Sequence, residues 1–166
     1  MGIETDGFMS PTLGEVKNSQ VVEEIAKFVK AEPDAYYTVV IGTDSQTKVI
    51  EGKSQVDYVT AVIVHREGYG ARYFWRKERI VQKPVLRDKI YRETLMSITT
   101  ASEMVPELRL AISAAKYDFE IHVDVGTAGP TREMIKEVTG MVRANGFAVK
   151  TKPESWGAST VADKHT

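Results

Sequence analysis

The sequence predicts an α/β protein with a mixed five-stranded sheet flanked by helices, and three observations support this fold class. First, residues 36–41 form an apolar, β-branched run, as expected for a strand buried on both faces. Second, apolar runs at 58–64 and 72–81 follow across connections too short for crossover helices, which indicates a three-stranded antiparallel meander. Third, helical periodicity precedes the later strands at 120–125 and 147–150, which favours parallel pairing.

Composition sets the size and class of the protein. With 166 residues, the chain is long enough for one sizeable core, so we expect a single domain over residues 1–166. It is 42% hydrophobic and 27% charged, and no apolar run approaches the roughly 20 residues of a membrane helix. There is no cysteine, and Glu4 and Asp6 stand where a signal peptide would be basic. We therefore expect a cytoplasmic protein with no membrane partner.

The first half of the chain alternates loops and regular elements. Residues 1–18 carry Gly, Pro, Ser and Thr without periodicity, which predicts an irregular N-terminal arm. Ser19 can then cap a helix that ends before Pro33. A polar connection at 45–54 separates the first two strands. After the meander, the pattern predicts a helix from Pro84 to about residue 104.

The second half supplies the parallel strands. A further helix is expected at 107–115, after Pro106. The strand at 120–125 then ends in a glycine-rich turn, Thr131 starts another helix, and Ser155 caps a short terminal helix. A right-handed crossover would pair the strand at 120–125 with the first strand and place Asp124 beside Asp44.

Four acidic residues occupy positions that local structure would not favour. Asp44 and Asp124 stand at predicted strand ends, Glu93 on the flank of a helix, and Asp163 in the terminal helix. A like-charged cluster costs several kcal/mol unless a cation neutralises it. Carboxylates without cysteine suit Mg²⁺ or Mn²⁺, and three or four of them can hold two ions about 4 Å apart for displacement at phosphorus. Alternatively, Asp44 and Asp124 could each simply cap a turn.

These residues lie in motifs that resemble a known family. The motifs are Ile41-Gly42-Thr43-Asp44-Ser45-Gln46, Ile121-His122-Val123-Asp124-Val125-Gly126, and Lys152-Pro153-Glu154-Ser155-Trp156-Gly157-Ala158-Ser159 with Ala162-Asp163-Lys164. Together with the element order, they resemble the ribonuclease H-like superfamily and, within it, the YkuK-like family of predicted ribonuclease H-related nucleases. The resemblance covers nearly the whole chain.

The resemblance implies a ribonuclease H-like fold and a metal-dependent nuclease that cleaves RNA, DNA or an RNA/DNA hybrid. By the same resemblance, Asp44, Glu93 and Asp124 would be the principal ligands of two Mg²⁺ or Mn²⁺ ions, with Asp163 as a fourth. No covalent protein nucleophile is needed in that fold family.

Other residues in the motifs are candidates for the surroundings of the site. Thr43, Ser45 and Gln46 could bond substrate or support the ligands. Three more have a functional and a structural interpretation. His122 could orient Asp124 or bind a metal, or it could be a buried structural histidine. Lys152 could contact phosphate or serve solubility, and Trp156 could stack on a base or pack the terminal helix.

The chain is locally basic although its net charge is only -1. Residues 66–92 contain nine basic and three acidic side chains, with Tyr73, Phe74 and Trp75 among them. Such a stretch suits binding along a nucleic-acid backbone with base stacking. The alternative is a strand and a helix with solvated basic faces.

Two other functions fit parts of the sequence. A non-catalytic nucleic-acid-binding or scaffold module could keep the same fold. Asp124-Val125-Gly126-Thr127 also resembles the phosphate-binding turn of actin-like ATPases and sugar kinases, although those proteins need a second lobe. Thr127 of this turn is a further candidate to contact substrate or support the ligands. The sequence does not predict an oligomeric state.

Overall fold

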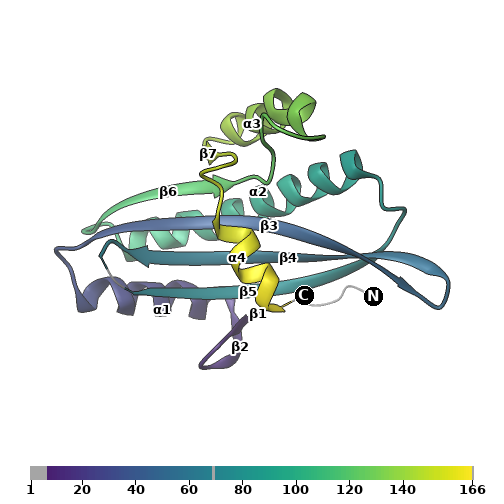
Figure 1. Ribbon diagram of the computed structural model, residues 1–166. Coiled ribbons are helices and arrows are strands. Elements are labelled where there is room, and N and C mark those ends of the chain that lie inside the picture. Colours follow the sequence, from purple (N-terminus) through teal and green to yellow (C-terminus); the bar gives the residue numbers. More distant parts are fainter. Residues whose placement is uncertain (1–6, 69, 166) are drawn as a thin grey trace.

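A single seven-stranded sheet with helices on both faces forms the centre of the protein (Figure 1). This computed structural model describes residues 7–68 and 70–165, apart from the side chains of residues 158 and 162–164. The strand order is β2-β1-β5-β4-β3-β6-β7. The predicted mixed α/β fold is therefore confirmed, but with seven strands where five were predicted.

The predicted meander is present, with longer strands than expected. It consists of β3 (Tyr36–Ile50), β4 (Lys53–Arg66) and β5 (Ala71–Val81), paired antiparallel. The polar connection predicted at 45–54 is wrong, because most of it is strand. A two-residue turn closes the hairpin, with φ of 53° at Glu51 and 76° at Gly52. Positive φ at both central residues matches the twist of the flanking strands.

The parallel part of the sheet leaves an open notch beside β3. This notch is the space past the end of β6, where β3 continues without a described partner strand on that side. Strand β6 (Lys116–His122) pairs parallel with β3 and with β7 (Ala148–Lys150), as predicted. Its pairing with β3 ends where His122 lies opposite Gly42, while β3 continues to Ile50. Asp44 was predicted at the end of a strand but lies within one. It comes just past the last residue of β3 that pairs with β6.

The two additional strands lie in the predicted irregular arm, so that prediction is wrong for residues 7–17. Strands β1 (Gly7–Ser10) and β2 (Gly14–Lys17) form a hairpin, and Met9 of β1 pairs with Trp75 of β5. Phe8 and Val16 are buried and provide the apolar contacts that hold the hairpin against the core. Isolated apolar residues in so short a segment gave no clear periodicity.

The helices follow the predicted order with one difference in continuity. They are α1 (Asn18–Ala31), α2 (Leu86–Ala111), α3 (Ile135–Ala144) after a short 3₁₀ turn, η1 (Arg132–Met134), and α4 (Gly157–His165). The helix predicted to end near residue 104 instead runs through Pro106. Because proline has no backbone N–H, the carbonyl of Ser102 lacks its helical hydrogen-bond donor. Both Pro106 and Ser102 are exposed, so water can bond that carbonyl instead.

Alternating side chains of the sheet pack against opposite helical layers. Val39 and Ile41 of β3 belong to the large core cluster with α1 and α2, whereas Val40 between them packs with Val161 of α4. Figure 1 shows α4, in yellow, crossing β3 and β4 on the face opposite α1. Within the described residues, no helix is both long and apolar enough to cross a membrane.

Candidate functional site

The notch between β3 and β6 contains a pocket of about 250 Å³. Its walls come from β3, the first turns of α2, the segment after β6 and the segment after β7. The lining residues are Asp44, Ser45, Leu86, Lys89, Ile90, Glu93, Asp124, Ala128, Pro130, Thr131 and Lys152. A larger groove of about 970 Å³ lies between α2 and β5 and contains none of the candidate residues.

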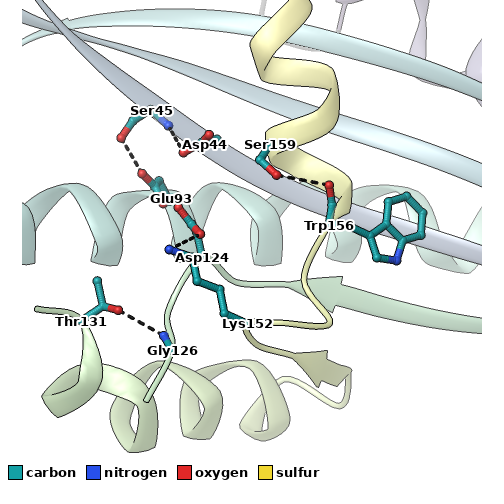
Figure 2. Close-up of polar contacts among 9 residues, drawn as sticks. All are labelled: Asp44, Ser45, Glu93, Asp124, Gly126, Thr131, Lys152, Trp156 and Ser159. Carbon is teal, nitrogen blue, oxygen red and sulfur yellow. Dashed lines mark hydrogen bonds and ion pairs between the residues drawn. The ribbon is translucent and has the colours of Figure 1, made fainter. Parts of the chain in front are cut away.

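Three of the four candidate metal ligands line this one pocket (Figure 2). Asp44 comes from the middle of β3, Glu93 from the second turn of α2, and Asp124 from the second residue after β6. Their convergence follows from the parallel pairing of β3 with β6 and from the packing of α2 on β3. Asp163 belongs to α4, but its side chain is outside the described part of the structure.

Glu93 is the most constrained of the three carboxylates. Its side chain is nearly fully buried, Oε2 accepts a hydrogen bond from the Ser45 hydroxyl, and Oε1 is buried without a hydrogen-bond partner. Burial, followed by the charges of Asp44 and Asp124, raises the pKa of Glu93 to about 8, although the Ser45 hydrogen bond opposes the shift. The pocket therefore favours a bound proton or another positive charge at Glu93.

A buried hydroxyl network fixes the distance between β3 and α2. Thr43 Oγ1 lies 2.8 Å from Ser97 Oγ and 3.0 Å from Thr60 Oγ1. Thr43 precedes Asp44 on the strand, and Ser97 lies about one helical turn after Glu93. The candidate Thr43 thus acts behind the pocket, where it joins the two elements that carry carboxylates.

Asp124 is paired with a lysine at the mouth of the pocket. Lys152 Nζ lies 3.0 Å from Asp124 Oδ1, and Figure 2 shows this contact. A second lysine, Lys89, extends from α2 and donates to Thr47 Oγ1 at 3.3 Å. Lys89 lies one turn before Glu93 and lowers that residue's pKa slightly against the larger effect of burial. Two cations therefore border the acidic pocket.

The donor set suits a hard divalent cation, although the carboxylates are not arranged around one. Among the described side chains, which leave out Asp163, no group of three His, Asp or Glu residues has the geometry to hold an ion. Glu93 instead bonds Ser45, Asp124 pairs with Lys152, and Asp44 Oδ1 accepts from the Ser45 amide at 2.9 Å. The buried, unpartnered Oε1 of Glu93 is the atom that an ion in the pocket would satisfy.

Four of the other candidates lie away from the pocket. Gln46 and Thr127 are exposed and do not line it. His122 is buried; its Nε2 bonds Glu120 at 2.8 Å and its Nδ1 accepts from the Gly157 amide at 3.1 Å. Burial lowers the His122 pKa, so the ring is neutral and positions α4. Trp156 packs edge-on against His122, with ring centroids 5.2 Å apart.

Two polar residues of the pocket, Lys89 and Thr131, were not among the sequence candidates. Lys89 lies four residues before Glu93, and this spacing on a predicted helix would have placed both side chains on one face. The Thr131 hydroxyl accepts from the Gly126 amide at 3.1 Å and so holds the segment after β6 in place. No sequence pattern distinguished this threonine from an ordinary helix start.

The basic stretch at 66–92 is largely engaged in structural contacts. Arg66 stacks over Phe28, Arg76 bonds Thr100, and Arg79 pairs with the buried Asp57. Of the aromatics in the stretch, Phe74 is in the core, and Trp75 stacks on His165 with centroids 3.6 Å apart. These contacts favour the structural interpretation of the stretch over a continuous nucleic-acid surface.

Comparison with known proteins identifies the family. The family described as Ribonuclease H-like matches residues 20–166. The chain is also 33% identical over 174 aligned positions to the Bacillus subtilis (strain 168) protein named "Uncharacterized protein YkuK", covering 97% of this chain and 98% of that protein. No solved structure matches the sequence. Because both similarities span most of the sequence, the chain belongs to the ribonuclease H-like family and, within it, to the YkuK-like proteins.

Proposed function

We propose that the protein is a metal-dependent nuclease that hydrolyses phosphodiester bonds in RNA, DNA or an RNA/DNA hybrid. The observation that carries the proposal is the convergence of Asp44, Glu93 and Asp124 on one pocket. Glu93 has a buried oxygen without a partner there. Family membership supports a role related to nucleic acids.

In this proposal, the three carboxylates hold Mg²⁺ or Mn²⁺, two ions in all, and Asp163 of α4 contributes a fourth ligand. Bound ions of this kind supply an activated water and stabilise charge at phosphorus. The protein's own contribution is placement: Asp44 is fixed within a paired strand, and Glu93 is held by Ser45. Ion binding would also displace the proton that burial favours on Glu93.

The decisive experiment measures cleavage of labelled single-stranded, duplex and hybrid oligonucleotides with Mg²⁺ or Mn²⁺. We expect cleavage by the wild type that EDTA abolishes, and a loss of at least about a hundredfold in Asp44→Asn and Asp124→Asn. Asp34→Asn, an exposed aspartate outside the pocket, is the matched control and should keep full activity. Equal cleavage by all four proteins would exclude the proposed site.

A non-catalytic nucleic-acid-binding module is the second candidate, because no described group of three side chains has metal-binding geometry. It predicts oligonucleotide binding without turnover and no effect of EDTA on that binding. A gel-shift titration run beside the cleavage assay separates the two candidates.

A further inference from the structure

We propose that Lys152 is a tethered counter-ion of the carboxylate pocket: it neutralises Asp124 in the metal-free protein, is displaced by the metal, and then binds a substrate phosphate. The inference rests on the proposed function, because it assigns a role at the same site. Its starting observation is the 3.0 Å ion pair between Lys152 Nζ and Asp124 Oδ1.

The backbone of Lys152 is held at a fixed place beside the pocket. Its amide donates to the Val125 carbonyl at 2.8 Å, and the Val123 amide donates to the Lys150 carbonyl at 2.9 Å. These two bonds continue the pairing of β7 with β6 past the last paired residues. Lys152 is therefore placed next to Asp124 by backbone pairing, and the ion pair follows from that placement.

The stem of Lys152 lies over a residue that lacks a side chain. A Cβ added at Gly126 would lie 3.0 Å from Lys152 Cβ and 3.4 Å from its Cδ. A larger residue at 126 would thus push the lysine away from Asp124. Gly126 and the backbone bonds of Lys152 together aim one ammonium group at one of the three carboxylates.

Competition with a metal follows from the chemistry of Asp124. Its Oδ1 is directed to the ammonium, and an ion bound at the same oxygen would face Lys152 at close range with the same sign of charge. The other lysine of the pocket, Lys89, is bonded to Thr47 instead. Lys152 is therefore the cation that an ion at Asp124 would displace.

The displaced ammonium would remain at the mouth of the pocket. The Lys152 side chain is 54% exposed, so it can turn outward while its backbone stays paired. A lysine ammonium binds phosphate as a compact point charge, without fixed geometry. A phosphodiester held beside the metal would therefore lie within reach of the Lys152 ammonium group.

The test measures Mn²⁺ binding by titration calorimetry in the wild type, Lys152→Met, Lys152→Ala and Lys150→Ala. Lys152→Met keeps the apolar stem, and Lys150→Ala removes an exposed charge two residues away as a control for net charge. We expect Mn²⁺ to bind about threefold to tenfold more tightly to both Lys152 variants, as removal of a partly exposed competing ion pair implies. Lys150→Ala should remain within about twofold of the wild type.

A second measurement tests the phosphate half of the inference. With Ca²⁺ in place of the catalytic ion, Lys152→Met should bind a labelled oligonucleotide several-fold more weakly than Lys150→Ala does, because one phosphate contact is lost. Equal oligonucleotide affinities would overturn that half. Unchanged or weaker Mn²⁺ binding in both Lys152 variants would overturn the counter-ion role while the proposed nuclease stands. Absence of Mn²⁺ binding in the wild type would instead overturn the proposed metal site.

Discussion

Thr43 Oγ1 lies 2.8 Å from Ser97 Oγ, and this buried contact joins the residue before Asp44 to a residue about one turn after Glu93. Two carboxylates on different elements are thereby held at a fixed separation. The same hydroxyl reaches Thr60 of β4 at 3.0 Å, so the contact spans two strands and a helix. We infer that the spacing of Asp44 and Glu93 depends on this network.

Thr43→Val tests how much this network contributes to the stability of the folded protein. The substitution keeps the shape of the side chain but leaves the hydroxyls of Ser97 and Thr60 without this partner in the core. Leaving buried polar groups unpaired costs about 1–3 kcal/mol. Urea denaturation should show a loss of that size in the free energy of unfolding.

A double-mutant cycle with Ser97→Ala provides the control for Thr43→Val. Because the two hydroxyls interact directly, the sum of the stability losses in the two single variants should exceed the loss in the double variant by about 0.5 kcal/mol or more. Strictly additive losses would mean that the contact contributes nothing to stability.

Glu93 should make the metal-free protein less stable as pH rises. Its pKa is about 8 in the folded protein and near 4.5 when exposed, so between these values the folded state binds a proton that the unfolded state has lost. The free energy of unfolding should therefore fall from about pH 5 to pH 8, by on the order of a few kcal/mol, and then level off. Urea denaturation with EDTA across this range measures the effect.

Glu93→Gln should remove this pH dependence, because the amide is neutral throughout. The variant should be more stable than the wild type at pH 9. Glu103→Gln, an exposed position on the same helix, should follow the wild type. A Glu93→Gln profile that falls as steeply as the wild type would show that another group titrates.

Periodicity predicted the main elements, but not the details that place Asp44. The apolar run of β3 and the parallel pairing with β6 were correctly predicted, and they bring Asp44 of β3 and Asp124, two residues after β6, to one pocket. The extension of β3 past Asp44 could not be predicted, since polar residues of a protruding hairpin bury little apolar surface and carry no alternating signal. The β1–β2 hairpin was missed because its few buried apolar residues, such as Phe8 and Val16, give no clear periodicity in so short a segment.

The acidic residues of the pocket could be predicted from the sequence, but the lysine that pairs with one of them could not. Asp44, Glu93 and Asp124 stand out because carboxylates are unusual at those positions, and they do line one pocket. The pairing of Lys152 with Asp124 joins segments 28 positions apart and depends on how the chain continues after β7. No local pattern encodes such a contact, so Lys152 had two equal interpretations.

Mn²⁺ should stabilise the wild type through the same acids. An ion that binds only the folded protein raises the free energy of unfolding by about 2.7 kcal/mol when its free concentration is a hundred times its Kd. Thermal unfolding should therefore shift upward with Mn²⁺ in the wild type and much less in Asp124→Asn. An equal shift in both proteins would place the ion elsewhere.

Gly157 should be essential for the packing of α4 on the sheet. Its amide donates to His122 Nδ1, and a Cβ added there would lie 2.6 Å from Val40 Cγ1 and 3.3 Å from that ring nitrogen. Gly157→Ala should therefore force the start of α4 off the sheet and lower the free energy of unfolding by about 1–3 kcal/mol in urea denaturation. Because the clash is mainly with Val40, adding Val40→Ala should recover part of the loss, so that the double variant is more stable than the sum of the two single effects predicts. If the effects simply add, the clash with Val40 is not what limits residue 157 to glycine.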